Sequence, residues 1–202
     1  MTGPYRISTP NDAVSLILGF PRSPAQQDPL FSSLRLHWEA AGLDVVHVAL
    51  DLSEGDAKLE ERYIETVQSH GSSGAVVIGG FSLGARIAAQ ASSMLESLGL
   101  LCLGYPFHVR GDGRHRHGLE TLRGLHTPTL IVQGTRDPHG NREEVTGYGQ
   151  LPACVRLHWL EDGNHRFRPR RPSGQTEVGH VRSAADAGVE FIVRALESRS
   201  NA

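Results

Sequence analysis

One glycine-rich motif in this chain presents a serine that could act as a nucleophile. The motif is Gly80-Phe81-Ser82-Leu83-Gly84, of the form G-x-S-x-G. It follows an apolar run, Ala75–Ile78, that is typical of a buried strand, and it leads into a segment rich in helix-forming residues. A strand, a G-x-S-x-G turn and a helix in this order are typical of a nucleophile elbow, in which a strained turn lifts the hydroxyl above the sheet. We therefore predict that Ser82 is a nucleophile; the alternative is an ordinary serine in a tight turn.

A serine hydroxyl needs a histidine base, and that histidine needs a carboxylate to orient it. Asp137 comes shortly after a second apolar run, Thr129–Gln133, and His165 comes shortly after a third, Val155–Leu160. The carboxyl ends of parallel strands meet at one edge of a sheet, so both side chains are expected at the edge that carries Ser82. We predict that Asp137 and His165 complete a catalytic triad. The alternatives are a turn-forming role for Asp137 and a solvated loop position for His165.

Several of the eleven histidines compete with His165 for the role of base. His158 lies inside a predicted strand. His139 follows Asp137 so closely that the carboxylate is not expected to orient its ring. His180, just before the last predicted helix, is the second candidate for the base.

Short apolar runs alternate with longer helical patterns, as in βα units that build a parallel sheet. We predict a single α/β domain over residues 1–202, a three-layer α/β/α sandwich with a mostly parallel sheet of about six strands. The predicted strands are Ala13–Gly19, Asp44–Ala49, Ala75–Gly79, Leu100–Gly104, Thr129–Gln133 and Val155–Leu160. The predicted helices are Pro29–Ala41, Asp56–His70, Leu83–Ser97, Arg142–Gly147 and Ser183–Arg199, and the two long predicted loops are Phe107–Gly118 and Arg166–Gly179.

The composition excludes several functional classes. Hydrophobic residues make up 39% of the chain, charged residues 21%, and the formal net charge is −2, so a global attraction to nucleic acid is not expected. The start of the chain lacks the pattern of a secretion signal, and no apolar run is long enough to cross a bilayer. Cys102 and Cys154 are expected as free thiols, and His115 and His117 form an H-x-H without an evident third metal ligand. We expect a cytoplasmic protein that needs no cofactor or metal.

With these residues in hand, the chain resembles the α/β-hydrolase superfamily, and within it the small predicted hydrolases related to dienelactone hydrolase. The resemblance runs from about Val14 to Phe191 and is carried by the serine motif and by three further segments. These segments are Gly104-Tyr105-Pro106, Leu130-Ile131-Val132-Gln133-Gly134-Thr135-Arg136-Asp137-Pro138 and Trp159-Leu160-Glu161-Asp162-Gly163-Asn164-His165. The resemblance implies a sheet flanked by helices without a large lid. It also implies the chain order Ser, Asp, His, which excludes His108, His115 and His117 as the base.

The resemblance is broken at the segment that completes the oxyanion hole. Relatives usually carry His-Gly after the first parallel strand, whereas this chain has Leu18-Gly19-Phe20-Pro21-Arg22. Pro21 has no N–H to donate. We therefore predict Leu83 as one donor and Phe20 or Arg22 as the other.

The predicted activity is cleavage of an ester or thioester bond of a small substrate through an acyl-enzyme on Ser82. Two other functions stay open: a non-catalytic binding or scaffold protein that keeps the fold, and an acyltransferase. Arginines are frequent in the two long loops, which allows a preference for anionic substrates, although solvated arginines would give the same pattern. These loop arginines are Arg110, Arg114, Arg116, Arg166, Arg168, Arg170 and Arg171. The sequence leaves the natural substrate and the oligomeric state open.

Overall fold

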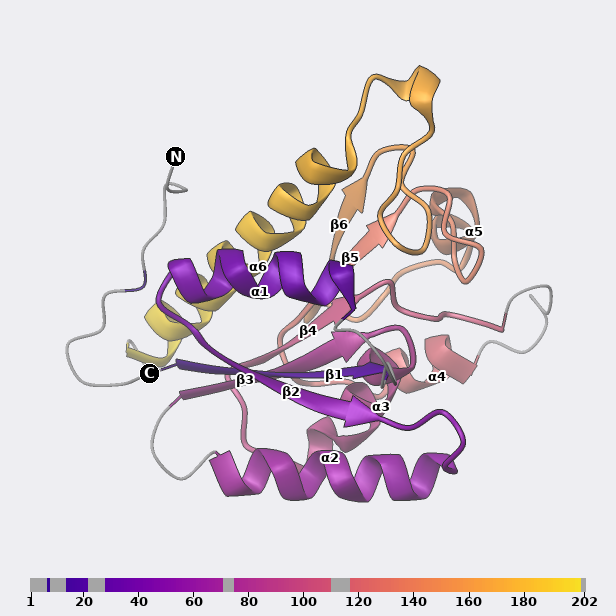
Figure 1. The fold of residues 1–202 in the computed structure, drawn as a ribbon. Coiled ribbons are helices and arrows are strands. Elements are labelled where there is room, and N and C mark those ends of the chain that lie inside the picture. The colour runs from indigo at the N-terminus through magenta and orange to yellow at the C-terminus, as the bar shows by residue number, and fades with distance from the viewer. Residues whose placement is uncertain (1–6, 8–13, 22–27, 71–74, 110–116, 201–202) are drawn as a thin grey trace.

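Six strands form one parallel sheet in the computed structural model, which describes residues 7, 14–21, 28–70, 75–109 and 117–200. The strand order is β2-β1-β3-β4-β5-β6, and every neighbouring pair is parallel. Figure 1 shows these strands side by side with helices on both faces. The predicted α/β sandwich is therefore confirmed. The strands are β1 (Val14–Pro21), β2 (Asp44–Leu50), β3 (Ala75–Phe81), β4 (Gly99–Leu103), β5 (Thr129–Gly134) and β6 (Val155–Leu160).

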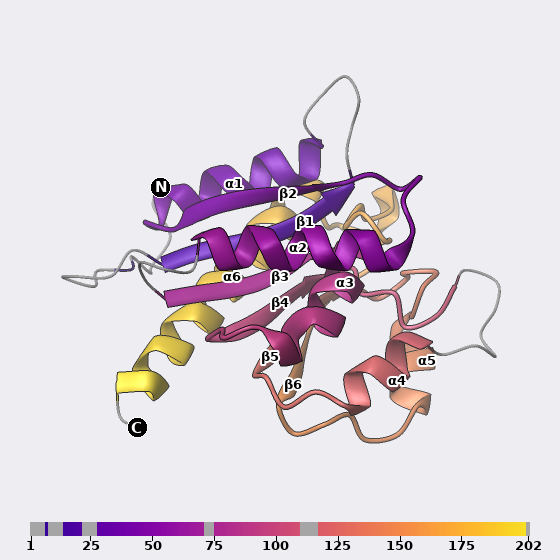
Figure 2. The same ribbon diagram turned by 90° about the horizontal axis from the view of Figure 1, so that it is seen from below.

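Helices α1 and α6 cover one face of the sheet, and α2 and α3 lie on the opposite face (Figures 1 and 2). The first face carries α1 and α6, which contact each other where the indole N–H of Trp38 donates to the carbonyl of Ala185, at 3.2 Å. In α1 the buried side chains recur at helical spacing, so one face of this helix meets the sheet. The helices are α1 (Pro29–Ala40), α2 (Asp56–His70), α3 (Leu83–Ala91), α4 (His117–Arg123), α5 (Arg142–Gly147) and α6 (Glu177–Ser200), with short 3₁₀ turns at Ser92–Met94 and Arg171–Ser173.

The centre of the sheet is tied to α2 through a buried tyrosine. The hydroxyl of Tyr63 accepts the N–H of Gly79 at 2.7 Å and lies 2.9 Å from the carbonyl of Ile17, on the neighbouring strand. The phenol is fully buried. This contact supports the end of β3, from which the serine turn begins.

Two predicted helix boundaries are wrong and one short helix was not expected, each for a local reason. The helix after the serine ends at Ala91 instead of Ser97, where the hydroxyl of Ser92 bonds the carbonyl of Ala89 at 2.8 Å and the chain turns toward β4. The short helix α4, at the end of the predicted loop Phe107–Gly118, was not predicted because one or two turns carry too little periodicity.

The last helix begins at Glu177, six residues before the predicted start at Ser183. Thr176 caps it, since its hydroxyl oxygen accepts the N–H of Gly179 at 3.0 Å. Gly179 in the first turn hides the helical pattern in the sequence. His180 therefore lies inside the helix, and the loop predicted to end at Gly179 is shorter.

We expect Gly84→Ala to destabilise the fold by about 3 kcal/mol, the upper end of the usual cost of overpacking. A Cβ atom on Gly84 would lie 1.9 Å from the carbonyl oxygen of Gly19, because α3 crosses β1 in backbone contact. Urea unfolding measures the change. Gly147→Ala is the matched control, since nothing lies within 4 Å of its Cβ position. Equal stability of the two variants would contradict this close approach.

Candidate active site

Three side chains that are distant in the sequence meet at the carboxyl edge of the sheet. Nε2 of His165 lies 3.0 Å from Oγ of Ser82, and Nδ1 of His165 lies 2.8 Å from Oδ2 of Asp137. They follow β3, β5 and β6, respectively. A carboxylate only accepts hydrogen bonds, so Nδ1 carries the proton and Nε2 is free to accept the proton of the serine. The structure thus brings together the three residues predicted from the sequence.

Ser82 occupies a strained turn between β3 and α3. Its backbone φ of 54° and ψ of −117° lie outside the regions that L-residues prefer, at a cost of roughly 1–3 kcal/mol. The turn is held by the N–H of Ser82, which donates to the carbonyl of Leu103 at 2.9 Å, and by the N–H of Arg86, which donates to the carbonyl of Ser82 at 3.1 Å. Helix α3 starts at the next residue, so its first N–H groups have no partner within the helix. The strain thus holds the hydroxyl beside the positive end of a helix dipole.

The segment that carries His165 crosses the ends of the neighbouring strands to reach Ser82. A Cβ atom on Gly134, at the end of β5, would lie 2.4 Å from the carbonyl oxygen of Gly163. A Cβ atom on Gly104, just after β4, would lie 3.3 Å from the ring of His165. Glycine at these two positions lets the segment pass close above the sheet.

A tight turn fixes the residues on either side of His165. The side-chain oxygen of Asn164 accepts the N–H groups of Arg166 and Arg168, at 2.9 and 3.0 Å. Phe167 has a φ of 65°, and its carbonyl accepts a hydrogen bond from Nδ1 of His180 at 2.7 Å. His180, the second candidate for the base, therefore supports this turn in the structure.

The Asp137 carboxylate is fully buried and has a partner on each oxygen. Oδ1 accepts the N–H of His139 at 2.9 Å, and Oδ2 accepts from His165. The first contact is the turn that the sequence offered as the alternative role for this aspartate. Both contacts occur together, so the turn itself aims the carboxylate at the imidazole.

A second carboxylate, Asp162, anchors the end of β6. The Arg170 guanidinium, with help from Arg136, holds the pKa of Asp162 at about 2, well below its usual range. Asp162 also accepts the backbone N–H of Arg170 at 2.7 Å. Asp162 and Arg170 lie on either side of His165 in the sequence, so their contact closes the turn that carries it.

The described loop arginines are mostly paired with carboxylates of the chain itself. Arg166 pairs with Asp28 at 2.6 Å, Arg168 with Glu177 at 3.0 Å, and Arg170 with Asp162. Their charges are thus already neutralised near the site. Arg110, Arg114 and Arg116 lie outside the described residues, as does His115.

The predicted oxyanion-hole residues have different positions. Leu83 is the first residue of α3, so its backbone N–H is available at the helix start. Phe20 lies in β1 with its ring buried and stacked 5.5 Å from the ring of Phe81. Arg22 lies outside the described residues.

A pocket of about 620 Å³ opens beside Ser82. Its wall includes Leu83 and Arg86 of α3, Thr121 of α4 and His139 of the turn after β5. The sequence did not single out Arg86, whose guanidinium contacts both oxygens of Asp56 at 2.8 and 2.9 Å. Arg86 follows Ser82 by four residues, one turn along the helix, and this spacing could have indicated that it lies on the same side as the serine.

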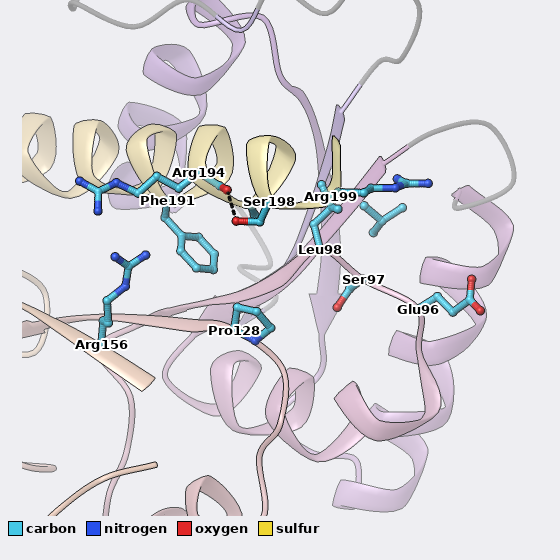
Figure 3. A pocket seen from close by; sticks show the side chains of 11 residues that line it. Glu96, Ser97, Leu98, Pro128, Arg156, Phe191, Arg194, Ser198 and Arg199 are labelled. Atoms are coloured by element: carbon cyan, nitrogen blue, oxygen red, sulfur yellow. Dashed lines mark hydrogen bonds between the residues drawn. The ribbon is translucent and has the colours of Figure 1, made fainter. Parts of the chain in front are cut away.

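A second pocket, of about 610 Å³, lies at the opposite edge of the sheet, where the strands begin. Figure 3 shows Phe191 and Pro128 in it, with Arg156 and Arg194 on one side and Arg199 and Glu96 on the other. It contains none of the site residues predicted from the sequence. The candidate active site is therefore the pocket beside Ser82.

Among the described residues, no helix has the length and apolar character needed to cross a membrane. In the same part of the chain, no three histidine, cysteine or carboxylate side chains gather as metal ligands do.

The sequence matches a protein-family model described as "Alpha/beta hydrolase domain" over residues 52–193. This range takes in the serine, the aspartate and the histidine described above. No curated protein matches the sequence.

Solved structures with the same fold include serine hydrolases and an esterase domain from Rhodothermus marinus. Est1E from Butyrivibrio proteoclasticus has a TM-score of 0.70 at 11% identity, covering 93% of this chain and 89% of that one. An alpha-beta serine hydrolase homologue from Coxiella burnetii has a TM-score of 0.67 at 19% identity, covering 92% and 88%. XC6422 from Xanthomonas campestris, described as a serine hydrolase without lid, has a TM-score of 0.64 at 20% identity, covering 94% and 91%. At these identities the likeness shows the fold only. In XC6422 this fold has no lid.

Proposed function

The chain belongs to the α/β-hydrolase family, and from that premise we propose that it is a serine hydrolase that cleaves an ester or thioester bond of a small substrate. The observation that carries the proposal is the continuous hydrogen-bonded path from Ser82 through His165 to the buried Asp137, with contacts of 3.0 and 2.8 Å. A strained serine at a helix start beside a pocket supports it as well.

In the first half of the proposed reaction, Oγ of Ser82 attacks the carbonyl carbon of the substrate while Nε2 of His165 accepts the hydroxyl proton. The carbonyl oxygen becomes an oxyanion, which the N–H of Leu83 and a second donor, Phe20 or Arg22, stabilise. Asp137 keeps the imidazolium oriented. The carbon–oxygen or carbon–sulfur bond then breaks, and the proton on His165 passes to the leaving alcohol or thiol.

In the second half, a water molecule gives a proton to His165 and attacks the acyl-enzyme. The proton returns to Oγ of Ser82 as the acid leaves, so the enzyme is regenerated without a cofactor. Two of the structural relatives are described as serine hydrolases, which supports a serine nucleophile here as well.

A panel of p-nitrophenyl esters and acyl thioesters with increasing acyl length tests the proposal. We expect saturable turnover of at least one ester or thioester, together with covalent labelling by a fluorophosphonate probe. Addition of alcohol and amine acceptors separates hydrolysis from acyl transfer, because a transferase forms the acceptor ester or amide at the expense of free acid. Absence of both turnover and labelling would favour the non-catalytic alternative.

A further inference from the structure

His139 is held in the wall of the candidate active site by two backbone contacts. Its ring Nδ1 lies 3.2 Å from the carbonyl oxygen of His108, and its own carbonyl accepts the N–H of His108 at 3.3 Å. Its ring centroid lies 4.7 Å from that of His165. The turn after β5 therefore places a second imidazole directly against the proposed catalytic base.

The contact with His108 determines which nitrogen of this second imidazole carries the proton. A carbonyl oxygen can only accept, so Nδ1 of His139 must be the donor. In the neutral ring, Nε2 is then left with a lone pair. Burial lowers the pKa of His139, and the adjacent His165 lowers it further, so the ring is neutral at pH 7.

This lone pair has no partner among the described residues. His139 lines the same pocket as Ser82. The guanidinium of Arg86, a source of donors in the same wall, already contacts Asp56 and Gln90. The mechanism above does not use His139. A half-buried acceptor beside the nucleophile is therefore available to a substrate.

We propose that Nε2 of His139 accepts a hydrogen bond from a hydroxyl group of the substrate, so that the enzyme prefers hydroxylated esters over matched esters without a hydroxyl group. This inference rests on the proposed hydrolase function and adds a substrate class to it. Because the ring is anchored through Nδ1 and packed against His165, the acceptor is already oriented before the substrate binds. Little ordering is needed on binding, which favours a measurable preference.

Two pairs of esters test the proposal, and each pair differs only by methylation of one hydroxyl. One pair carries the hydroxyl on the alcohol part, 2-hydroxyethyl butyrate and 2-methoxyethyl butyrate. The other carries it on the acyl part, ethyl 3-hydroxybutyrate and ethyl 3-methoxybutyrate. We expect kcat/KM of the wild type, measured by acid release in a pH-stat, to favour the hydroxylated member of at least one pair by about three- to tenfold, the usual effect of one hydrogen bond.

His139→Phe is the informative variant, because it keeps an aromatic ring against His165 and removes the acceptor. The preference ratio should fall to about one, as expected when the acceptor is lost. His158→Phe is the matched control. His158 lies on β6 and bonds Ser183 at 2.9 Å, away from the pocket, so the ratio should not change.

The outcomes separate this inference from the function on which it rests. Turnover of both members of each pair at equal kcat/KM in the wild type would overturn the role of His139 and leave the hydrolase proposal standing. A preference that survives His139→Phe would also overturn it. No turnover of any ester, with no fluorophosphonate labelling, would overturn both proposals together.

Discussion

Ser82→Ala is expected to abolish labelling by a fluorophosphonate and to lower ester turnover by on the order of 10⁵-fold. The substitution removes the only atom of the proposed path that can form the acyl-enzyme. The pocket and the start of α3 stay intact, so substrate still binds and a small residual rate remains. Gel-based labelling and initial rates on the best ester of the panel measure the two effects.

The chain itself offers a matched control for this variant. Ser183 lies 2.9 Å from Nε2 of His158, so it forms a serine–histidine contact as short as that of Ser82 with His165. Ser183 lies within α6 and lacks the strained turn. Ser183→Ala should therefore label and react like the wild type. If Ser82→Ala still labels, the nucleophile lies elsewhere; if Ser183→Ala also loses labelling, the effect of Ser82→Ala is not specific.

Asp137→Asn has the second large effect that we expect, a fall in kcat on the order of 10⁴-fold with little change in fold. An asparagine can still accept the N–H of His139 with its oxygen. Its amide nitrogen then faces Nδ1 of His165, which must become an acceptor. The proton moves to Nε2, and the ring donates to Ser82 instead of accepting from it. The serine is thus left without a base.

The kinetic signature of this variant distinguishes a wrong tautomer from a damaged site. Substrate binding should persist, so kcat falls while KM changes little, and thermal unfolding should stay close to that of the wild type. Asp186→Asn removes a surface carboxylate that faces Arg182 at 3.7 Å and should leave both constants unchanged. An Asp137→Asn enzyme that keeps a tenth or more of the wild-type kcat would argue against the proposed role of the carboxylate.

The strands and the meeting of Ser82, Asp137 and His165 at one edge of the sheet could be predicted because they depend on local patterns. Buried parallel strands read as continuous apolar runs, and each of the three residues follows such a run at short distance. All six predicted strands overlap the observed ones, with ends that differ by up to two residues where they are described. Because all the strands are parallel, their carboxyl ends lie at the same edge of the sheet, and the three residues are therefore expected there.

The pairing of the loop arginine Arg166 could not be predicted, because its partner Asp28 lies on a distant segment of the chain. Arg166 and Asp28 are 138 residues apart in the sequence, and the residues around them give no indication of this contact. In the sequence, His139 stands out only as a competitor of His165 for the role of base. Its role beside His165 depends on how the turns after β4 and β5 pack, which depends on tertiary contacts. The start of α6 could not be predicted for a similar reason, because its cap, Thr176, is a single side chain.

His165 follows β6, the outermost strand on its side of the sheet. Order β2-β1-β3-β4-β5-β6 leaves β6 with one neighbouring strand, whereas β3, which leads to the serine, has two. Edge strands open more readily than central ones, because fewer backbone bonds must break. Partial fraying would carry the imidazole away while the nucleophile kept its place. Loss of activity in denaturant should thus precede loss of secondary structure, and the enzyme would be inactivated before it unfolds.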